Sequence, residues 1–396
     1  MGFRGPVKSG DRSQRLSLRW PTGALKIGID AITPGASLDP GAGGMRMYLT
    51  TLTAKMSEQQ PDVRFVVLEN RHFPLAELNG LSNVTRVVCP GVPASRVGRM
   101  IYQNSALPIF LRRLRINGLL ATCNVLPFGC PVPSVVVVQS LQYFDHPEAY
   151  GWLRGAYLRA AIGYSCRHAE ALICVSETAR RDLIRLTGVR GDKVGVIYHG
   201  ISPEIAGYTG DTAPVSPPYI LCVATLYRYK NISRLLEAFA LVKIESGIPH
   251  RLRVIGGEAD MSIAELAFQA QRLGVAEEVD LLGPLPHGRM AAEYAHASVF
   301  VYPSLSETFG LPPLEAMTRG VPVVASRAAS IPEIVGEAAE LVDPLDVGDI
   351  ARGLRHVLLD SARADALVRL GFKRASEFSW DAAARRTFKA ITSVLV

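Results

Sequence analysis

The chain lacks the long apolar runs that direct proteins into or across membranes. None of its 396 residues lies in a run approaching the ~20 apolar residues that span a bilayer. The N-terminal segment is basic but has no apolar core, so it does not form a signal peptide. Pro6 stands where a myristoylation signal has Ser or Thr. We therefore expect residues 1–22 to be a flexible extension and the protein to be cytoplasmic.

Cysteine pairs are also missing. No two of the six cysteines form a CxxC motif; they are Cys89, Cys123, Cys130, Cys166, Cys174 and Cys222. Most lie in or beside apolar runs, where a free cysteine packs as a small hydrophobic residue. This pattern argues against structural zinc and favours a reducing compartment.

Acidic residues are outnumbered by basic ones. The 36 Asp and Glu against 43 Lys and Arg give a net charge of +7, and the pI is about 9.1. Such a charge predicts an anionic partner. Because no nucleic-acid recognition motif accompanies it, an anionic substrate and an anionic membrane surface are favoured over nucleic acid.

One apolar stretch, residues 101–111, has basic residues on both sides. The arginines are Arg96, Arg99, Arg112, Arg113 and Arg115. A basic face beside Ile, Leu and Phe side chains can rest on anionic lipid. Arginines on a helix more often form a solvated face, and Pro108 interrupts this helix. The sequence leaves both interpretations open.

Apolar strand-forming runs, in contrast, are abundant. The composition, 48% hydrophobic and 20% charged, is that of a globular protein, and the length favours two domains. Apolar runs alternating with helix-length segments are typical of doubly wound α/β domains. The expected strands are 25–30, 64–68, 84–88, 119–122, 135–139, 171–175 and 194–198 in one domain, and 219–223, 252–255, 279–282, 299–302, 321–325 and 340–342 in the other.

A segment rich in Pro, Gly, Ser and Thr, residues 203–218, divides these two groups of strands. Such a composition is typical of a linker. We therefore predict domains at 23–202 and 219–376, followed by a last helix within 377–396.

The most informative stretch is residues 298–326. Two apolar strands flank a loop and a short helix, expected at Pro312–Arg319 and ended by Gly320. The prolines at the helix start bring no N–H, so the free amide donors are those near Phe309, Gly310 and Leu311, where the helix dipole favours an anion. Glu307 precedes the helix and Glu315 lies on it. Carboxylates beside a phosphate site suit a ligand that carries hydroxyl groups next to phosphate.

Two further segments are candidate phosphate sites. Gly43 and Gly44 belong to a glycine-rich turn expected ahead of a helix, but Arg46 stands where a GxGxxG motif needs glycine, so a phosphate site and a plain tight turn have equal support. Arg228 and Lys230 follow a strand, where two cations can hold a pyrophosphate. An exposed helix-start lysine is the alternative, although cations are disfavoured at helix N-termini.

Other residues become candidates because they follow strands, since ligands bind at the carboxyl ends of parallel strands. They are Gln139 and Ser140, Ser176 and Glu177, and His199 and Gly200. For Ser176, capping of the next helix is the simpler interpretation.

These motifs together resemble glycosyltransferase family 4, the large group of retaining nucleotide-sugar glycosyltransferases. The matching pieces, in order, are Gly43–Gly44, Val175–Glu177, Tyr198–Gly200, Lys230–Asn231, Gly256–Gly257, Leu282–Gly283, the run from Tyr302 through Glu307, Gly310, Glu315 and Gly320 to Val324, Ile331–Ile334 and Phe378–Trp380. The resemblance covers roughly residues 25 to 390. It implies the GT-B fold, with two Rossmann-like domains facing across a cleft and the last helix crossing back to the N-terminal domain.

The resemblance also implies roles for individual residues. The N-terminal domain would bind the acceptor and the C-terminal domain the sugar nucleotide, without a metal or other cofactor, in agreement with the absence of a DxD motif. Glu307 would contact donor-sugar hydroxyls, and Glu315 the ribose. Lys230 and Arg228 would hold the diphosphate. Backbone amides of the segment Thr308 to Leu311 would complete the donor site.

Two departures from the family pattern affect these roles. Ala224–Thr225 replaces a Gly-Arg pair, so Arg228 is the candidate substitute. Gln139–Ser140 replaces a His-Asp pair, and Gln139 can donate a hydrogen bond to the donor sugar but cannot become cationic.

The function expected from the resemblance is transfer of a hexose or deoxyhexose, of mannose, glucose or rhamnose type. The acceptor would be a hydroxyl in polysaccharide, lipopolysaccharide or glycolipid synthesis, at the inner face of the membrane. The alternatives are a sugar-nucleotide epimerase on the same fold and a non-catalytic sugar-nucleotide-binding subunit.

Overall fold

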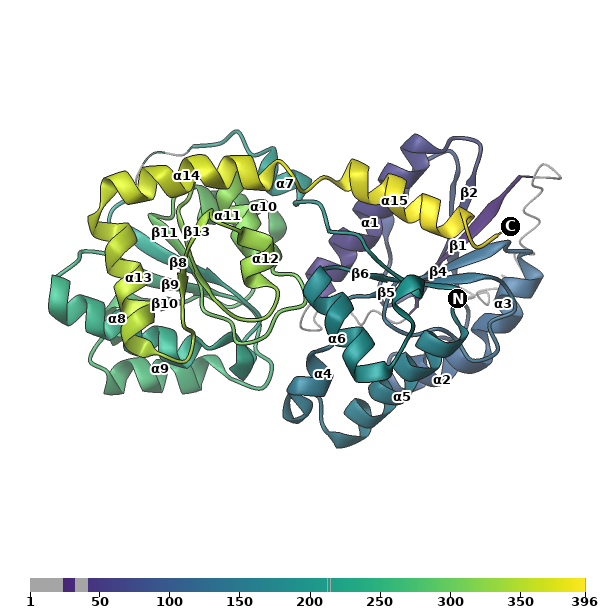
Figure 1. The fold of residues 1–396 in the computed structure, drawn as a ribbon, viewed down its shortest axis with the longest axis horizontal. Coiled ribbons are helices and arrows are strands. Elements are labelled where there is room, and N and C mark those ends of the chain that lie inside the picture. The colour runs from purple at the N-terminus through teal and green to yellow at the C-terminus, as the bar shows by residue number, and fades with distance from the viewer. Residues whose placement is uncertain (1–23, 33–41, 212, 214, 396) are drawn as a thin grey trace, which may run out of the picture.

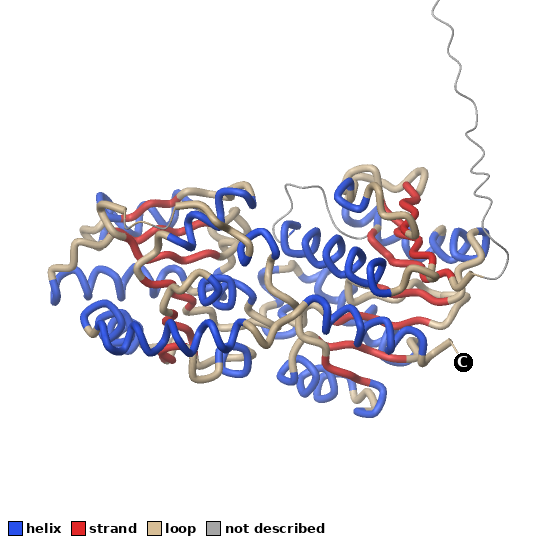
Figure 2. The backbone as a smooth tube through the Cα atoms, turned by 90° about the horizontal axis from the view of Figure 1, so that it is seen from above, coloured by secondary structure: helices blue, strands red, loops and turns tan. Residues whose placement is uncertain are grey.

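The computed structural model describes residues 24–32, 42–211, 213 and 215–395. They form two α/β units side by side, each with one parallel sheet and helices packed against it (Figures 1 and 2). Within these residues, no helix combines the length and apolarity that crossing a bilayer requires.

The first unit has a seven-stranded sheet in the order β3-β2-β1-β4-β5-β6-β7. Its inner strands are buried on both faces, which is why they are continuous apolar runs, whereas the edge strands β3 and β7 are partly exposed. The strands are β1 (Lys26–Ala31), β2 (Arg64–Glu69), β3 (Val84–Val88), β4 (Gly118–Ala121), β5 (Ser134–Val138), β6 (Ala171–Cys174) and β7 (Val194–Val196). The helices are α1 (Ala42–Gln59), α2 (Arg96–Ser105), α3 (Leu107–Arg113), α4 (Gln142–Asp145), α5 (Trp152–His168) and α6 (Glu177–Thr187).

The second unit has a six-stranded sheet in the order β10-β9-β8-β11-β12-β13. The strands are β8 (Tyr219–Val223), β9 (Arg251–Ile255), β10 (Val279–Leu281), β11 (Val299–Tyr302), β12 (Val323–Ser326) and β13 (Ala339–Val342). The helices are α8 (Ile232–Ser246), α9 (Ile263–Arg272), α10 (His287–Ala295), α11 (Leu311–Thr318), α12 (Ile331–Val335), α13 (Val347–Leu359) and α14 (Ser361–Ala375). Each strand order reverses direction next to its first strand, which is the place where doubly wound sheets bind ligands.

Two helices connect the units. The short helix α7 (Pro203–Ala206) packs against α10 and α11 of the second unit. At the other end of the chain, α15 (Trp380–Thr392) crosses back and lies along α1 of the first unit (Figure 1). Ser379 caps α15, and the Trp380 indole donates to the carbonyl of Ile201 at 2.9 Å. The predicted two-sheet GT-B architecture with a returning last helix is confirmed.

The two faces of the first sheet are covered differently. Apolar side chains of α1 and α15 pack on one face, as part of a core that also includes the second unit. Side chains of α3, α5 and α6 pack on the other face. In Figure 1, α2, α3 and α5 accordingly lie together on the side of the sheet opposite α1 and α15.

Two expected helix boundaries were wrong. Helix α1 begins at Ala42, so Gly43 and Gly44 lie inside its first turn and not in a turn ahead of it. Helix α11 begins at Leu311 because Gly310, at φ +96°, takes the left-handed conformation that ends the preceding loop.

Candidate active site

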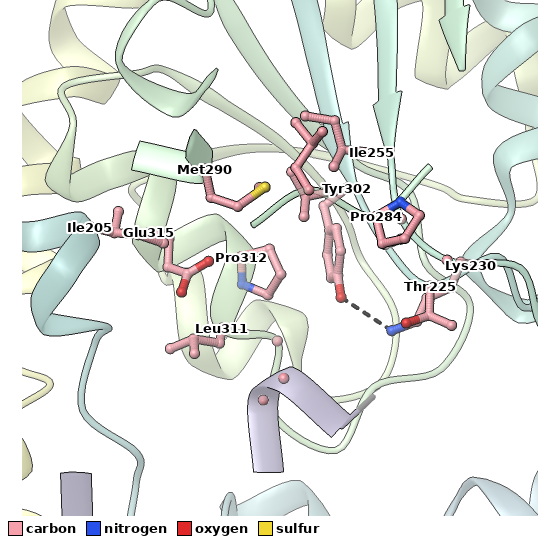
Figure 3. A pocket seen from close by; sticks show the side chains of 18 of the residues that line it. Ile205, Thr225, Lys230, Ile255, Pro284, Met290, Tyr302, Leu311, Pro312 and Glu315 are labelled. Atoms are coloured by element: carbon pink, nitrogen blue, oxygen red, sulfur yellow. Dashed lines mark hydrogen bonds between the residues drawn. The ribbon is translucent and has the colours of Figure 1, made fainter. Parts of the chain in front are cut away.

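A cavity of about 860 Å³ lies between the two units (Figure 3). The first unit and α7 contribute Gly43, Gly44, Arg46, Phe73 and Ile205. The second unit contributes most of the lining: Val223, Ala224, Thr225, Lys230, Ile255, Gly256, Gly257, Glu258, Ile263, Pro284, Leu285, Pro286, Met290, Tyr302, Glu307, Gly310, Leu311, Pro312 and Glu315. Many of these follow the carboxyl ends of β8, β9, β10 and β11, where ligands of parallel sheets bind.

A lysine–carboxylate pair lies in this cavity. The Lys230 ammonium forms an ion pair with Glu307, and it donates to the Tyr302 hydroxyl at 3.2 Å, the bond drawn in Figure 3. Tyr302 in turn donates to Glu307 Oε1 at 2.6 Å. Burial and the neighbouring Glu307 raise the pKa of Tyr302, so its hydroxyl stays protonated. The cation is therefore held in a fixed position facing the space where a ligand can enter.

Lys230 itself is well enclosed. Its side chain is only 12% exposed, and it ends a short 3-10 turn that follows β8. This excludes the alternative of an exposed helix-start lysine. A buried charge pair of this kind is stable only when both partners are present.

The N-terminus of α11 provides backbone donors next to this pair. Gly310 lines the cavity, and its lack of a Cβ matters because a side chain there would also meet Ile331. Pro312 and Pro313 follow Leu311 and carry no N–H, so the donors at this end come from residues 309–311. The helix dipole makes this end favourable for an anion.

Glu315 lies one turn further along α11 and points toward the cavity (Figure 3). The Tyr294 hydroxyl donates to its Oε2 at 2.8 Å. Burial raises the pKa of Glu315 to about 7, and the bond from Tyr294 opposes this rise only in part. At neutral pH the carboxyl group can therefore both donate and accept hydrogen bonds, as a hydroxyl-bearing ligand requires.

Glycine is needed on the β9 side of the cavity. A Cβ on Gly256 would overlap the backbone of Ala224, the residue that follows β8. Glu258, two residues later, accepts from the Ile263 amide at 2.7 Å at the start of α9. The sequence identified Gly256 and Gly257 only as part of the family resemblance, and Tyr302 and Glu258 were not among its candidate site residues.

Arg228 is not brought into the site. It does not line the cavity, and its guanidinium forms an exposed ion pair with Glu265 at 3.0 Å. The prediction that Arg228 holds a diphosphate is therefore not supported by the geometry. Arg228 and Lys230 lie in the same 3-10 turn, but their side chains have different partners. Lys230 pairs with Glu307 in the cavity, whereas Arg228 pairs with Glu265 outside it, and the Arg228 backbone N–H donates to Asp260 at 2.7 Å.

Thr308 and Phe309 also lie outside the cavity lining, although they adjoin Glu307 and Gly310. The carbonyl of Thr308 accepts from the Ser176 hydroxyl at 2.7 Å, and that of Phe309 accepts from Ser330 at 2.9 Å. These two contacts fix the loop before α11. Thr308 and Phe309 could therefore contact a ligand only through their backbone amides.

Gln139, at the end of β5, does not line the cavity either. Its backbone N–H donates to Asn124 at 2.6 Å, and its Nε2 is buried without a partner among the described residues. The Gln139 side chain lies beside the buried Tyr48 hydroxyl, and its contact with a donor sugar stays a prediction.

The Tyr198–Gly200 segment contacts the loop before α11 from the first unit. The His199 ring stacks on Phe309 at 4.9 Å, and burial lowers the pKa of His199 to about 4, so the ring is neutral near pH 7. Gly200 packs directly against Trp380, where a Cβ would overlap the indole. His199 therefore packs against the loop before α11 through Phe309.

A contact between the two units was missed by sequence reasoning. Glu333 of α12 accepts from four groups of the first unit: the amides of Glu177 and Thr178 at 2.6 and 2.8 Å, the Thr178 hydroxyl at 2.7 Å and the Tyr198 hydroxyl at 3.0 Å. A carboxylate from one unit thus caps helix α6 of the other. Ser176 caps α6 as expected, through the Ala179 amide at 3.0 Å.

Two parallel-sheet units that face each other across a cavity define the GT-B class of glycosyltransferases. Family models agree: "Glycosyl transferases group 1" matches residues 211–374, and "Glycosyltransferase Family 4" matches residues 42–205. The chain therefore belongs to glycosyltransferase family 4 and is a transferase of glycan biosynthesis.

Individual relatives are similar over part of the chain. The O-antigen chain mannosyltransferase B of Escherichia coli is 31% identical over 267 residues, which are 65% of this chain and 69% of that protein. A serotype-specific mannosyltransferase WbdA of Escherichia coli is 28% identical over 57% of this chain, a match that spans only 29% of that longer protein.

Solved structures share the fold at low sequence identity. Sucrose-phosphate synthase from Thermosynechococcus elongatus superposes with a TM-score of 0.73 at 19% identity, covering 93% of this chain and 98% of the other. The Anabaena protein HepE, in complex with UDP and glucose, gives a TM-score of 0.71 at 19% identity over 93% of this chain and all of the other.

Proposed function

We propose that the protein is a retaining glycosyltransferase that uses a nucleoside-diphosphate hexose of mannose type. The observation that carries this proposal is the cavity itself, in which Lys230, the N-terminus of α11 and the buried Glu315 lie together. A cation and backbone donors suit a diphosphate, and a carboxyl group with a pKa near 7 suits ribose hydroxyls. The mannose type follows from the names of the relatives.

In the proposed reaction the bond between the anomeric carbon and the diphosphate oxygen breaks. Lys230 and the amides of residues 309–311 stabilise the negative charge that develops on the departing diphosphate. The acceptor hydroxyl forms the new bond on the same face of the sugar and gives its proton to the departing phosphate. Glu307, paired with Lys230, contacts sugar hydroxyls and does not form a covalent intermediate.

We further propose that this reaction needs no metal ion. Lys230 and the helix end supply the positive potential that a divalent cation would otherwise provide. Transfer that persists in excess EDTA would support this, and transfer that requires added Mg²⁺ or Mn²⁺ would contradict it.

The acceptor is proposed to be a growing polysaccharide or lipid-linked glycan at the cytoplasmic face of the membrane. The excess of basic residues over the whole chain supports an anionic environment of this kind. Glycan synthesis as the setting rests on the O-antigen relative.

A nucleotide panel tests the donor site first. Thermal shifts with UDP, GDP, ADP, dTDP and their hexose conjugates are measured without metal, for the wild type, Glu315→Ala and the exposed control Glu337→Ala. A ligand at about 100 times its dissociation constant stabilises by roughly 2.7 kcal/mol. One nucleotide class should shift the wild type and the control equally and Glu315→Ala less. No shift with any nucleotide would refute the donor site.

Turnover separates the remaining candidates. Release of nucleoside diphosphate with transfer to an acceptor, and retention of the anomeric configuration by NMR, are expected. An epimerase would instead return an altered sugar or sugar nucleotide without an acceptor product, and a non-catalytic subunit would bind nucleotide without turnover.

A further inference from the structure

A surface outside the cavity carries large apolar side chains exposed to solvent. Val97 and Ile101 are one helical turn apart on α2 and are 64% and 63% exposed, and Trp152 and Leu153 at the start of α5 are 76% and 67% exposed. Ile109 on α3 and Phe128 are also exposed. Burying rings and aliphatic chains is favourable, so a cluster of exposed ones marks an interaction surface. We call the exposed side of α2, α3, α5 and the loop at Phe128 the α2–α5 face.

This face is continuous. The side chain of Asn104 on α2 donates to the Tyr157 hydroxyl of α5 at 3.0 Å, and it accepts from the Phe128 amide at 3.0 Å. The Phe128 ring also lies edge-on against Tyr164 of α5, with the ring centroids 4.6 Å apart. The two helices and the loop therefore form one surface, on the side of the first sheet seen below it in Figure 1.

The helices of this face carry basic residues and no acidic ones, and the nearest exposed acids, Glu148 and Glu170, lie just before and just after α5. Helices α2, α3 and α5 contain no Asp or Glu, and none occurs between Glu77 and Asp145 in the sequence. Exposed arginines lie on the same helices or directly after them: Arg112, Arg113, Arg115 and Arg167. Arg99, in contrast, is buried and donates to the Ala94 carbonyl, so it is not part of the surface.

One end of the face reaches the boundary between the two units. Helix α2 follows β3, the Phe128 loop follows β4, and α5 follows β5, so their first residues lie at the carboxyl edge of the sheet. That edge faces the second unit: the ring of Tyr150, just before α5, is parallel to that of Tyr227 after β8, 6.4 Å apart. A membrane bound here would therefore reach the edge of the first unit that faces the second unit.

We propose that the α2–α5 face docks on an anionic lipid bilayer. Apolar side chains enter the headgroup region while arginines bind lipid phosphates, as in amphipathic interfacial helices. A second copy of the chain is a poorer partner, because a symmetric contact would bring the acid-free, basic helices of two copies together. The biological use, delivery of a lipid-linked acceptor, rests on the proposed function; the docking itself does not.

Vesicle sedimentation tests the proposal with the full-length wild-type chain. We expect binding to vesicles of phosphatidylglycerol and phosphatidylcholine, weak binding to pure phosphatidylcholine, and loss of binding as salt rises. Arg112→Gln with Arg113→Gln should weaken binding about fivefold for each arginine. Val97→Ser with Ile101→Ser should weaken it roughly tenfold or more.

The double variant Trp152→Ser with Leu153→Ser, on a different helix, repeats the test if the α2 variant does not fold. The matched controls are Ile244→Ser and Phe268→Ser, equally exposed apolar residues on α8 and α9 of the second unit. Controls should bind as the wild type does. Equal binding to neutral and anionic vesicles, no binding at all, or equal losses in controls and face variants would overturn the proposal.

Nucleotide-induced thermal shifts are measured on the same proteins, because the face does not line the cavity. Unchanged shifts with lost vesicle binding support a separate docking surface. A wild type that binds nucleotide but no vesicle overturns the docking inference alone, whereas vesicle binding without any nucleotide shift overturns the proposed function alone.

Discussion

Removing the carboxylate of Glu333 is expected to uncouple the two units. All four of its partners are donors: two amides at the start of α6 and the hydroxyls of Thr178 and Tyr198. Glu333→Gln keeps the size but turns an NH₂ group toward at least one donor, so it should behave almost like Glu333→Ala. Hydrogen bonds to a charged group contribute a net of about 1.5–3 kcal/mol each, and these four share one carboxylate, so their contributions are not additive.

We therefore expect a net loss of about 2–3 kcal/mol for the contact between the units, or roughly 30- to 150-fold in its equilibrium constant. The assay is kcat/KM for transfer together with the radius of gyration by small-angle X-ray scattering. Glu337→Gln, at an exposed position after α12, is the matched control. A Glu333→Gln variant with wild-type kcat/KM and radius of gyration would refute this reasoning.

Three further predictions concern buried charges. Lys230→Met should lower kcat at least 100-fold and destabilise the fold by about 3 kcal/mol, because the buried Glu307 carboxylate loses its cationic partner and keeps only the bond from Tyr302; adding Glu307→Gln should restore stability in urea melts but not activity. Burial raises the pKa of Glu315 to about 7, so its contribution to stability is full below pH 4.5 and is lost as pH rises toward 7. Urea melts should therefore show the stability of Glu315→Gln rising relative to the wild type by about 3 kcal/mol between pH 4.5 and 8, and a pH-independent difference would contradict the burial effect. Burial likewise raises the pKa of Asp30 to about 6, although Gln103 donates to it at 2.6 Å. The stability of Asp30→Asn should therefore also rise relative to the wild type between pH 4 and 7. A difference that does not change with pH would show that burial does not disfavour the ionised form of Asp30.

The strands were predictable from sequence because a strand buried on both faces of a parallel sheet must be a continuous apolar run. The proximity of Glu307 and Glu315 was also predictable, because only one short loop and the first turns of α11 separate them in the sequence. Local sequence also placed Lys230 correctly at the end of β8. For Arg228 the expected diphosphate contact stays a prediction, because local sequence does not determine which of two cations near one 3-10 turn faces the cavity.

The contact made by Glu333 could not be predicted in the same way. Its partners lie more than 130 residues away in sequence, and their meeting depends on how the two sheets are placed relative to each other. The Gly43–Gly44 segment illustrates the same limit on a smaller scale. A glycine pair is compatible with a turn or with a helix start, and in the structure it lies in the first turn of α1.

The contacts around residues 307–309 connect the state of the two units to the chemistry of the cavity. Ser176 of the first unit holds the Thr308 carbonyl at 2.7 Å, while Ser330 of the second unit holds the carbonyls of Glu307 and Phe309, each at 2.9 Å. Moving the units apart would release one side of this loop, and with it the position of Glu307 and of the amide donors at α11. Because electrostatic stabilisation of a leaving group depends on donors fixed before the reaction, we infer that the site is fully organised only when the units are in contact. An open enzyme would then bind a sugar nucleotide without activating it toward water.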